Sequence, residues 1–550
     1  MNINEYIINQ LYKKFPVKNQ NECFLKLKRK ASKKFWLQNP TNIELLKTYR
    51  EMIKNKKIKP NKNIENLLIT KKMRTLSGVA IIAVLTKPYP CPGTCKFCPN
   101  EKDMPKSYLS NEPAVMRAIL TNFHPYKQVQ ARLKSLEATG HKTDKIELII
   151  MGGTFSYLPK QYQTWFVKKC FSACNTGNVG TGRDLPLQQL QKINEKSKHR
   201  IIGLTLETRP DYIDQKEIIR MRKLGATRVE LGVQSIYNNV LKLNKRGHSV
   251  ATTIRATRLL KEAGFKINYH MMPNLPGSNC KRDLEMFKEL FSNPDFQPDM
   301  LKIYPCVVVK NAPIYRWLKT GKYKPYSEQE LLELLIKIKK IIPYYVRITR
   351  VIRDIPTTSI VAGNKISNLR QVLKKKSEEK GWQCKCIRCR EVGNSFMPRP
   401  IVGAGRDLPL RLFRQDYNAS NGKEIFLSFE DRKRVNIYSL LRLRINSGVH
   451  SLERILQQAQ NDNYRLKPEL QTIIREVHTY GKMMPIKSKN KNSPQHIGLG
   501  KKLILEAERI ISEEFNLKKI AVISGVGVRD YYRKLGYRLE NGYMVKSLRK

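Results

Sequence analysis

The segment Cys91-Pro-Gly-Thr-Cys95-Lys-Phe-Cys98 constrains this chain more than any other. Its three cysteines, spaced CxxxCxxC, follow an apolar run at residues 79–86 that predicts a buried strand. Three thiolates on one loop can ligate three irons of a [4Fe–4S] cluster and leave the fourth iron open to S-adenosylmethionine. Phe97, an aromatic residue before the last cysteine, is typical of this motif. The alternative is a zinc knuckle, but that site requires a fourth ligand and usually has paired CxxC units.

Short runs rich in β-branched residues recur through the middle of the chain, separated by segments with helical periodicity. They fall at residues 79–86, 145–153, 200–208, 227–235, 266–276 and 299–308. This alternation predicts an α/β domain with a parallel sheet, open or closed into a partial barrel. In such folds the active groups cluster in the loops at the carboxyl ends of the strands, and the cysteine loop comes directly after one.

Several other residues at predicted strand ends are candidates for binding a nucleotide cofactor. The turn Gly152-Gly153-Thr154 lets backbone approach a ligand, although two glycines after a strand are common. Glu207, Glu230 and Gln234 could bind ribose or amino groups. Taken singly, each of these three has the alternative interpretation of a polar residue satisfied by the protein itself.

The last 150 residues form a second, smaller predicted α/β domain. Within it, Gln495-His-Ile-Gly498-Leu-Gly500-Lys501 opens a helix. Glycines at a strand-to-helix turn free backbone N–H groups to bind a pyrophosphate, assisted by the helix dipole. The QxxGxG form resembles the acetyl-CoA loop of GNAT acyltransferases. The segment GVGVRDYYRKLGY (525–537) follows one strand later, where that fold places a tyrosine near the thioester.

A second cysteine group, Cys384-Lys-Cys386-Ile-Arg-Cys389, lies between the two predicted domains. The chain has 11 cysteines, and in a reducing compartment clustered cysteines indicate metal binding rather than disulfides. A structural zinc fits CxCxxC better than a second cluster does, and the spacing does not identify a fourth ligand.

The charge of the chain favours a polyanionic partner. Lys and Arg number 104 against 46 Asp and Glu, a formal charge of +58 spread from end to end. Nucleic acid is the natural candidate, and a Lys-rich compositional bias is the alternative. No segment approaches the roughly 18–20 apolar residues of a membrane span, and the first residues lack a signal-peptide pattern. A cytoplasmic protein is therefore expected.

We expect four parts along the chain. Residues 1–75 predict a basic, mostly helical extension that contacts RNA, with a solvated leader as the alternative. Residues 76–375 form the predicted partial barrel, 376–400 the cysteine-rich linker, and 401–550 the GNAT-like domain.

From about Leu76 to the C-terminus the sequence resembles the Elp3 family, the catalytic subunit of Elongator and its stand-alone archaeal and bacterial relatives. The strings that carry the resemblance are MGGTF, LETRPDY, ELGVQS, HMMPNLPG, RDIPTTSIVAGNKISNLRQ, CKCIRCREV, REVHTYG and AVISGVGVRDYYRKLGY. The resemblance implies a radical S-adenosylmethionine (SAM) domain and a GNAT-like domain that together modify the wobble uridine of tRNA. It implies that a 5′-deoxyadenosyl radical abstracts hydrogen from the methyl of acetyl-CoA, and that the carbon radical adds to C5 of uridine. Hydrolysis of the thioester then leaves 5-carboxymethyluridine.

The family's functional residues fall on matching positions of this chain. Cys91, Cys95 and Cys98 match the cluster ligands. The positions that match acetyl-CoA contacts are Lys145, Glu476, Val477, His478, Thr479, Leu499, Gly500, Lys501 and Tyr532. The chain departs from the family at Pro99-Asn100, where Pro-Gly-Gly is usual, and at Ile497, which replaces a glutamine. Neither change removes a ligand or a required glycine, so an active enzyme is expected.

Two other functions remain as alternatives. One is a protein lysine acetyltransferase of the histone type, for which Glu476 is the one candidate general base. The other is a non-catalytic tRNA-binding subunit. The expected partner is the anticodon stem-loop of tRNA, whose unpaired bases can enter a pocket at low cost. A homodimer and accessory subunits are both left open by the sequence.

Overall fold

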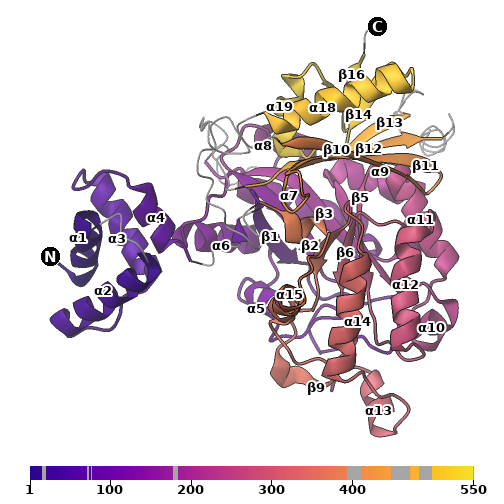
Figure 1. Cartoon of the computed structure of the whole chain (residues 1–550), viewed down its shortest axis with the longest axis horizontal. Helices are drawn as coiled ribbons and strands as arrows, with labels where there is room; N and C mark the ends of the chain where they lie inside the picture. Colours follow the sequence, from indigo (N-terminus) through magenta and orange to yellow (C-terminus); the bar gives the residue numbers. More distant parts are fainter. Residues whose placement is uncertain are drawn as a thin grey trace.

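The computed structural model describes residues 1–548 except 15–19, 71–73, 76, 178–183, 393–409, 448–470 and 482–497. Two seven-stranded sheets form the body of the molecule, and a separate bundle of helices projects from one side (Figure 1). Among the described residues, no helix is long and apolar enough to cross a membrane.

The first sheet is wholly parallel, with the order β1-β2-β3-β4-β5-β6-β8. Its strands are β1 (Ala80–Leu85), β2 (Lys145–Met151), β3 (Arg200–Thr208), β4 (Arg228–Gln234), β5 (Lys266–Met271), β6 (Met300–Ile303) and β8 (Arg347–Arg350). The sheet curls into a partial barrel whose edges, β1 and β8, do not pair. The predicted parallel sheet and its six strands are confirmed.

Helices cover the outer face of this curled sheet (Figure 1). They are α5 (Pro113–Ile119), α6 (Pro125–Ala138), α7 (Lys160–Cys174), α8 (Leu187–Asn194), α9 (Gln215–Leu224), α10 (Asn238–Leu243), α11 (Val250–Glu262), α12 (Cys280–Ser292), α14 (Glu328–Ile341) and α15 (Leu369–Glu379). The short helix α13 (Ile314–Lys319) instead packs against the strand β7 (Val308–Val309), outside this sheet. Because parallel strands need long crossover connections, the helices that join them cover the outer face of the sheet. The loops at the carboxyl ends of the strands are left to carry function.

The second sheet is mostly antiparallel, with the order β10-β11-β12-β13-β14-β16-β15. Its strands are β10 (Arg411–Ala419), β11 (Gly422–Glu430), β12 (Ile437–Asn446), β13 (Thr472–Thr479), β14 (Lys519–Val522), β15 (Arg538–Glu540) and β16 (Tyr543–Ser547). Helices α18 (Leu499–Arg509) and α19 (Arg529–Arg533) accompany it. Only β13 and β14 run parallel, and they pair at just two positions, after which they diverge.

The second sheet lies across the amino ends of the first, opposite the cysteine loop. Arg475 on β13 is fully buried, and its guanidinium binds both Asp299, before β6, and Glu424 on β11. Gly525 packs on the backbone of β3 so closely that a Cβ would lie 2.0 Å from the carbonyl oxygen of Ile202. A buried ion-pair network and backbone packing therefore fix the two sheets against each other.

Four N-terminal helices form a small bundle with its own apolar core: α1 (Ile3–Lys14), α2 (Gln20–Phe35), α3 (Asn42–Lys54) and α4 (Lys62–Leu68). The bundle stands apart from the body and approaches it near α6 (Figure 1). There Arg50 of α3 donates a hydrogen bond to the carbonyl of Glu137 at 2.9 Å. The helical prediction for this region is confirmed for its described residues.

Candidate functional site: one cavity between two cofactor motifs

A cavity of about 630 Å³ runs along the inside of the curled sheet. Cys91, Cys95 and Cys98 line it at the carboxyl ends of the strands, and residues 476–478 of β13 line it at the other end. The first cysteine motif and the predicted acetyl-CoA strand, nearly 400 residues apart in sequence, thus open into the same space.

At the cysteine end, two guanidinium groups lie beside the thiols. Nη1 of Arg246 lies 3.6 Å from Sγ of Cys95. Arg209 packs against Gly93 so closely that a Cβ there would lie 2.2 Å from its Nη1, and this buried Nη1 has no hydrogen-bond partner among the described residues. Burial raises the pKa of the Cys98 thiol to about 11. Positive charge at this place is what a thiolate-ligated cluster needs to offset its own negative charge.

The spread of the three sulfurs also suits a cluster rather than a single ion. Two sulfurs bonded to one zinc at about 2.3 Å cannot lie more than about 4.6 Å apart. Among the described residues, one group of three potential metal ligands has all its ligand atoms within 4.8 Å of one another, and it consists of Cys384, Cys386 and Cys389. The sulfurs of Cys91, Cys95 and Cys98 do not meet this criterion. Ligands of three different irons must be farther apart than ligands of one ion, so the donor set at Cys91, Cys95 and Cys98 fits a cluster.

The glycine turn after β2 forms part of the same wall. Gly152 has φ +132°, and a Cβ there would lie 2.0 Å from Oγ1 of Thr86. Gly153, at φ +97°, and Thr154 line the cavity. The two glycines are therefore required by close packing and by backbone conformation, and they leave backbone facing the cavity beside the cysteines.

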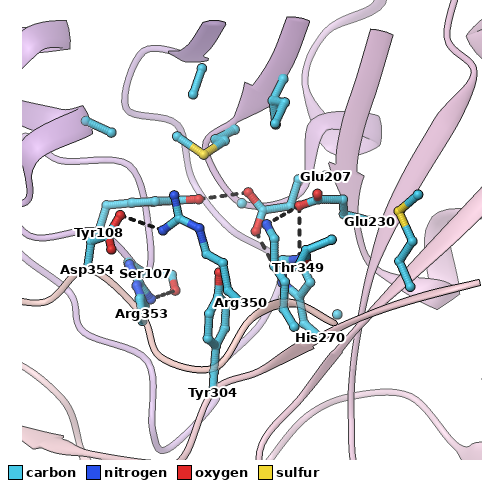
Figure 2. A pocket seen from close by; sticks show the side chains of 18 of the residues that line it. Ser107, Tyr108, Glu207, Glu230, His270, Tyr304, Thr349, Arg350, Arg353 and Asp354 are labelled. Carbon is cyan, nitrogen blue, oxygen red and sulfur yellow. Dashed lines mark hydrogen bonds and ion pairs between the residues drawn. The ribbon is translucent and has the colours of Figure 1, made fainter. Parts of the chain in front are cut away.

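The predicted acidic residues meet at the middle of the cavity (Figure 2). Glu207 accepts a hydrogen bond from the Tyr108 hydroxyl at 2.8 Å, and His270 lies between Glu207 and Glu230, with nitrogen–oxygen distances of 3.6 and 3.0 Å. Glu230 is 1% exposed and also binds Asn268 and the Lys302 ammonium. Although burial opposes it, Lys302 and His270 hold the pKa of Glu230 well below its usual range.

Sequence patterns had not pointed to His270, Asn268 or Lys302. These residues could have been found from strand alternation, because they lie on the cavity face of the neighbouring strands β5 and β6, beside Glu230 of β4. Gln234, also predicted, has the uncommon backbone angle φ +72°, and its buried Oε1 has no partner among the described residues. Gln234 thus presents an acceptor to the cavity that it lines, whereas the acceptors of Glu230 are occupied by protein donors.

At the β13 end, Glu476 is a buried member of an ion-pair network. It accepts a hydrogen bond from Nε of Arg442 at 2.9 Å and lies 3.8 Å from Nζ of Lys266. Burial alone would raise the pKa of Glu476, but Lys266 and Arg442 lower it to about 2. His478 is held by a 2.8 Å contact between its Nε2 and the carbonyl of Ser77.

The divergence of β13 from β14 leaves the backbone of residues 476–478 without a strand partner on that side, within the pairings described. Such an open strand edge can pair with an extended amide-containing chain, as in strand addition. Gly498, at φ +79°, begins α18, and a Cβ on Gly500 would lie 3.5 Å from both Oγ1 of Thr479 and the Tyr531 hydroxyl. Leu499 and Lys501 follow in the first turn of the helix. Gln495 and Ile497 of the predicted loop lie outside the described residues.

The two residues expected to act on acetyl-CoA occupy different places. Tyr532 is 6% exposed, within the core of the second sheet, and its ring contacts Tyr531 and Tyr537. Tyr531, which sequence patterns did not single out, is 40% exposed and faces the start of α18. Lys145 is the first residue of β2, at the end of the first sheet that meets the second; burial lowers its pKa. It is not among the residues that line the cavity.

The second cysteine triad forms a compact group outside the cavity. Cys384 and Cys386 are buried, the three Sγ atoms lie within 4.8 Å of one another, and Nζ of Lys339 lies 3.6 Å from Sγ of Cys389. This spacing is close to the limit of about 4.6 Å between two sulfurs bonded to one zinc ion, so the group is compact enough to be a candidate for a single metal ion. The described residues offer no fourth cysteine, histidine or carboxylate within that group.

Comparisons with known proteins agree with this architecture. Residues 89–290 match the radical SAM superfamily and residues 298–379 match its C-terminal domain. The chain is 48% identical to the tRNA uridine(34) acetyltransferase of Methanocaldococcus infernus, covering 93% of this chain and 92% of the relative. It is 39% identical to Elongator complex protein 3 of Saccharomyces cerevisiae, covering 94% and 91%.

Among solved structures, archaeal Elp3 of Methanocaldococcus infernus, lacking residues 1–46, is 46% identical and superposes with a TM-score of 0.72. It covers 86% of this chain and all of that one. The curled parallel sheet with its cysteine loop, the second sheet with its diverging strands, and relatives that match over nearly their full length lead to one assignment. The chain belongs to the Elp3 family of radical SAM proteins.

Proposed function

We propose that this chain is an enzyme that adds a carboxymethyl group to C5 of the wobble uridine of tRNA, using acetyl-CoA and SAM. The observation that carries the proposal is the single cavity lined both by the cysteine triad and by β13. Its relatives are named for tRNA uridine(34), which supports this substrate.

At the cysteine end, Cys91, Cys95 and Cys98 would hold a [4Fe–4S] cluster, and Gly152, Gly153, Thr154, Glu207, Glu230 and Gln234 would surround SAM. Bound there, the cluster and SAM supply a one-electron cleavage that generates a hydrogen-abstracting radical. Arg209 and Arg246 stabilise negative charge on the thiolates. Tyr108 fixes the Glu207 carboxylate by a hydrogen bond, which orients it toward the cavity.

At the other end, the start of α18 (Gly498, Leu499, Gly500 and Lys501) would bind the pyrophosphate of acetyl-CoA. Its pantetheine arm would run along Glu476, Val477, His478 and Thr479 of β13, directing the acetyl group into the cavity. Lys145 and Tyr532 are retained as acetyl-CoA residues on the strength of the family resemblance. Tyr531 is added because this residue is exposed and its hydroxyl lies next to Gly500.

The excess of positively charged residues in the cavity lining supports an anionic macromolecule as the other substrate. Fourteen Lys and Arg residues line the cavity against six Asp and Glu. With the basic helix α2 on the projecting bundle, this suits tRNA, whose backbone phosphates dominate its affinity for proteins. We retain the four-part division at residues 75, 375 and 400, and a structural zinc at Cys384, Cys386 and Cys389, as parts of the proposal.

Transfer of an acetyl group to protein lysines is less well supported. Such transfer needs a group that accepts a proton from the amine near neutral pH. Glu476, the one candidate in the sequence, has a pKa of about 2 and binds Arg442, so it is a poor base.

The test is mass spectrometry of nucleosides from tRNA incubated anaerobically with reconstituted enzyme, SAM, acetyl-CoA and a reductant. We expect 5-carboxymethyluridine with the wild type. If the cluster forms and SAM is cleaved but every uridine remains unmodified, the proposal is wrong, and acetylation of protein lysines is measured next on the same preparation.

A further inference from the structure

Three arginines from separate segments lie together on the cavity wall. Arg74 lies in the segment between α4 and β1, Arg117 on α5 and Arg132 on α6, and all three line the cavity. Burial and the nearby charges of Arg117 and Arg74 lower the pKa of Arg132 to about 10. Bringing these cations together therefore costs free energy, which an anionic ligand would recover.

Among the described residues, the carboxylates of the cavity form no ion pair with this arginine cluster (Arg74, Arg117 and Arg132). Burial and the charge of Arg74 lower the pKa of Arg117, and the nearby charge of Asp354 only partly opposes them. Five of the six carboxylates are paired with another Lys or Arg: Glu112 binds Arg353, Glu147 binds Arg228, Glu230 binds Lys302, Asp354 binds Arg350 and Glu476 binds Arg442. Glu207 binds Tyr108 and faces His270. Within the described part of the chain, no carboxylate forms an ion pair with the cluster; Arg117 donates only to the carbonyl of Pro113.

We propose that the arginine cluster binds backbone phosphates of the RNA next to the reacting uridine. The inference rests on the proposed function, because it assumes that a uridine enters the cavity. A planar guanidinium group can donate two N–H hydrogen bonds to the two non-bridging oxygens of a phosphodiester, and three such groups from different segments can hold a bent backbone.

The position of the cluster favours RNA over the phosphates of acetyl-CoA. Arg74 lies in the connection to the basic N-terminal bundle, and α6, which carries Arg132, is the helix that α3 of this bundle contacts. An RNA bound to the bundle would therefore reach the cavity at the cluster. The proposed pyrophosphate loop instead begins α18 on the second sheet.

Binding of tRNA to the reconstituted holoenzyme, measured by fluorescence anisotropy over a series of salt concentrations, tests this role. Arg132→Gln and Arg117→Gln should each weaken binding about tenfold and reduce the salt slope by about one. Arg255→Gln is the matched control, because Arg255 is exposed on α11 and does not line the cavity. The control and the affinity of every variant for acetyl-CoA should be unchanged.

The sharper version pairs these variants with an anticodon stem-loop in which single phosphates flanking the wobble uridine are replaced by neutral methylphosphonates. One replacement should weaken RNA binding to the wild type and to Arg255→Gln, but should cause no further weakening in Arg132→Gln.

Additive losses of RNA affinity would overturn the assignment. Normal RNA affinity with weakened acetyl-CoA binding would also overturn it and would assign the cluster to CoA. If Arg132→Gln fails to fold, Arg117→Gln and the charge-retaining Arg132→Lys carry the same comparison. Failure of the proposed function is distinct, because it would appear as unmodified uridine in the wild type with RNA binding intact.

Discussion

The two ends of the cavity are built by different means. At the cysteine end, the three proposed cluster ligands come from eight consecutive residues, and the arginines beside them come from other segments. At the β13 end, the features are a gap between two diverging strands and a carboxylate bound by residues from other segments. The start of helix α18 lies next to Val477 there but outside the cavity lining. The first end depends on the identity of a few side chains, whereas the second depends on backbone arrangement and on the packing of the two sheets.

The largest expected effect is at the cysteine end. Cys95→Ala combined with Cys98→Ala should abolish the cluster and SAM cleavage, lowering uridine modification by more than about 1,000-fold, because two of three iron ligands are lost. The affinity for acetyl-CoA, measured by calorimetry, should remain within about twofold of wild type. A parallel loss of acetyl-CoA binding would show that the two ends are not separable.

The reciprocal change is Gly500→Asp at the start of α18. It adds a carboxylate beside Thr479 and Tyr531, where a pyrophosphate is proposed to bind, so acetyl-CoA affinity should fall about 100-fold. The iron content and visible spectrum of the cluster should be unchanged. Gly500→Ala is the matched control, because its Cβ has ordinary contact distances of 3.5 Å.

The same contrast explains what could be predicted from the sequence. The six strands with apolar runs, the cysteine loop and the glycine turn were predicted because each is a contiguous pattern. Strand β8 was missed because RITR is short and polar, and β10 was missed because it is an exposed edge strand. The contacts of Glu230 with His270 and of Arg475 with Asp299 could not be predicted, since they depend on how distant segments pack.

A smaller effect on the reaction is expected at the second cysteine triad. Cys386→Ser should reduce bound zinc to near zero, as measured by inductively coupled plasma mass spectrometry. It should also lower the melting temperature by several degrees, because a structural metal stabilises the fold. SAM cleavage per cluster should change by less than about threefold, since this triad does not line the cavity. Loss of the cluster spectrum in this variant would contradict the assignment of separate roles.

The smallest effect concerns acid stability at the β13 end. The pKa of Glu476 is lowered from 4.5 to about 2, so its ion pairs stabilise the fold above pH 4.5, and this contribution is lost as the pH falls toward 2. Its size is on the order of 3 kcal/mol. Glu476→Gln should therefore be less stable than wild type at pH 6, by urea unfolding, and the difference should shrink at pH 3. A difference that is constant with pH would exclude an ionised, paired Glu476.

The most direct test of a shared cavity follows the methyl hydrogens of acetyl-CoA. The holoenzyme is incubated with tRNA, SAM and acetyl-CoA carrying a trideuterated methyl group, and the 5′-deoxyadenosine released is analysed by mass spectrometry. If the radical formed at the cysteine end abstracts hydrogen from acetyl-CoA bound at the β13 end, deuterium appears in 5′-deoxyadenosine. The Gly500→Asp variant, which should bind acetyl-CoA poorly, then loses this label. Modified uridine accompanied by unlabelled 5′-deoxyadenosine would contradict the account.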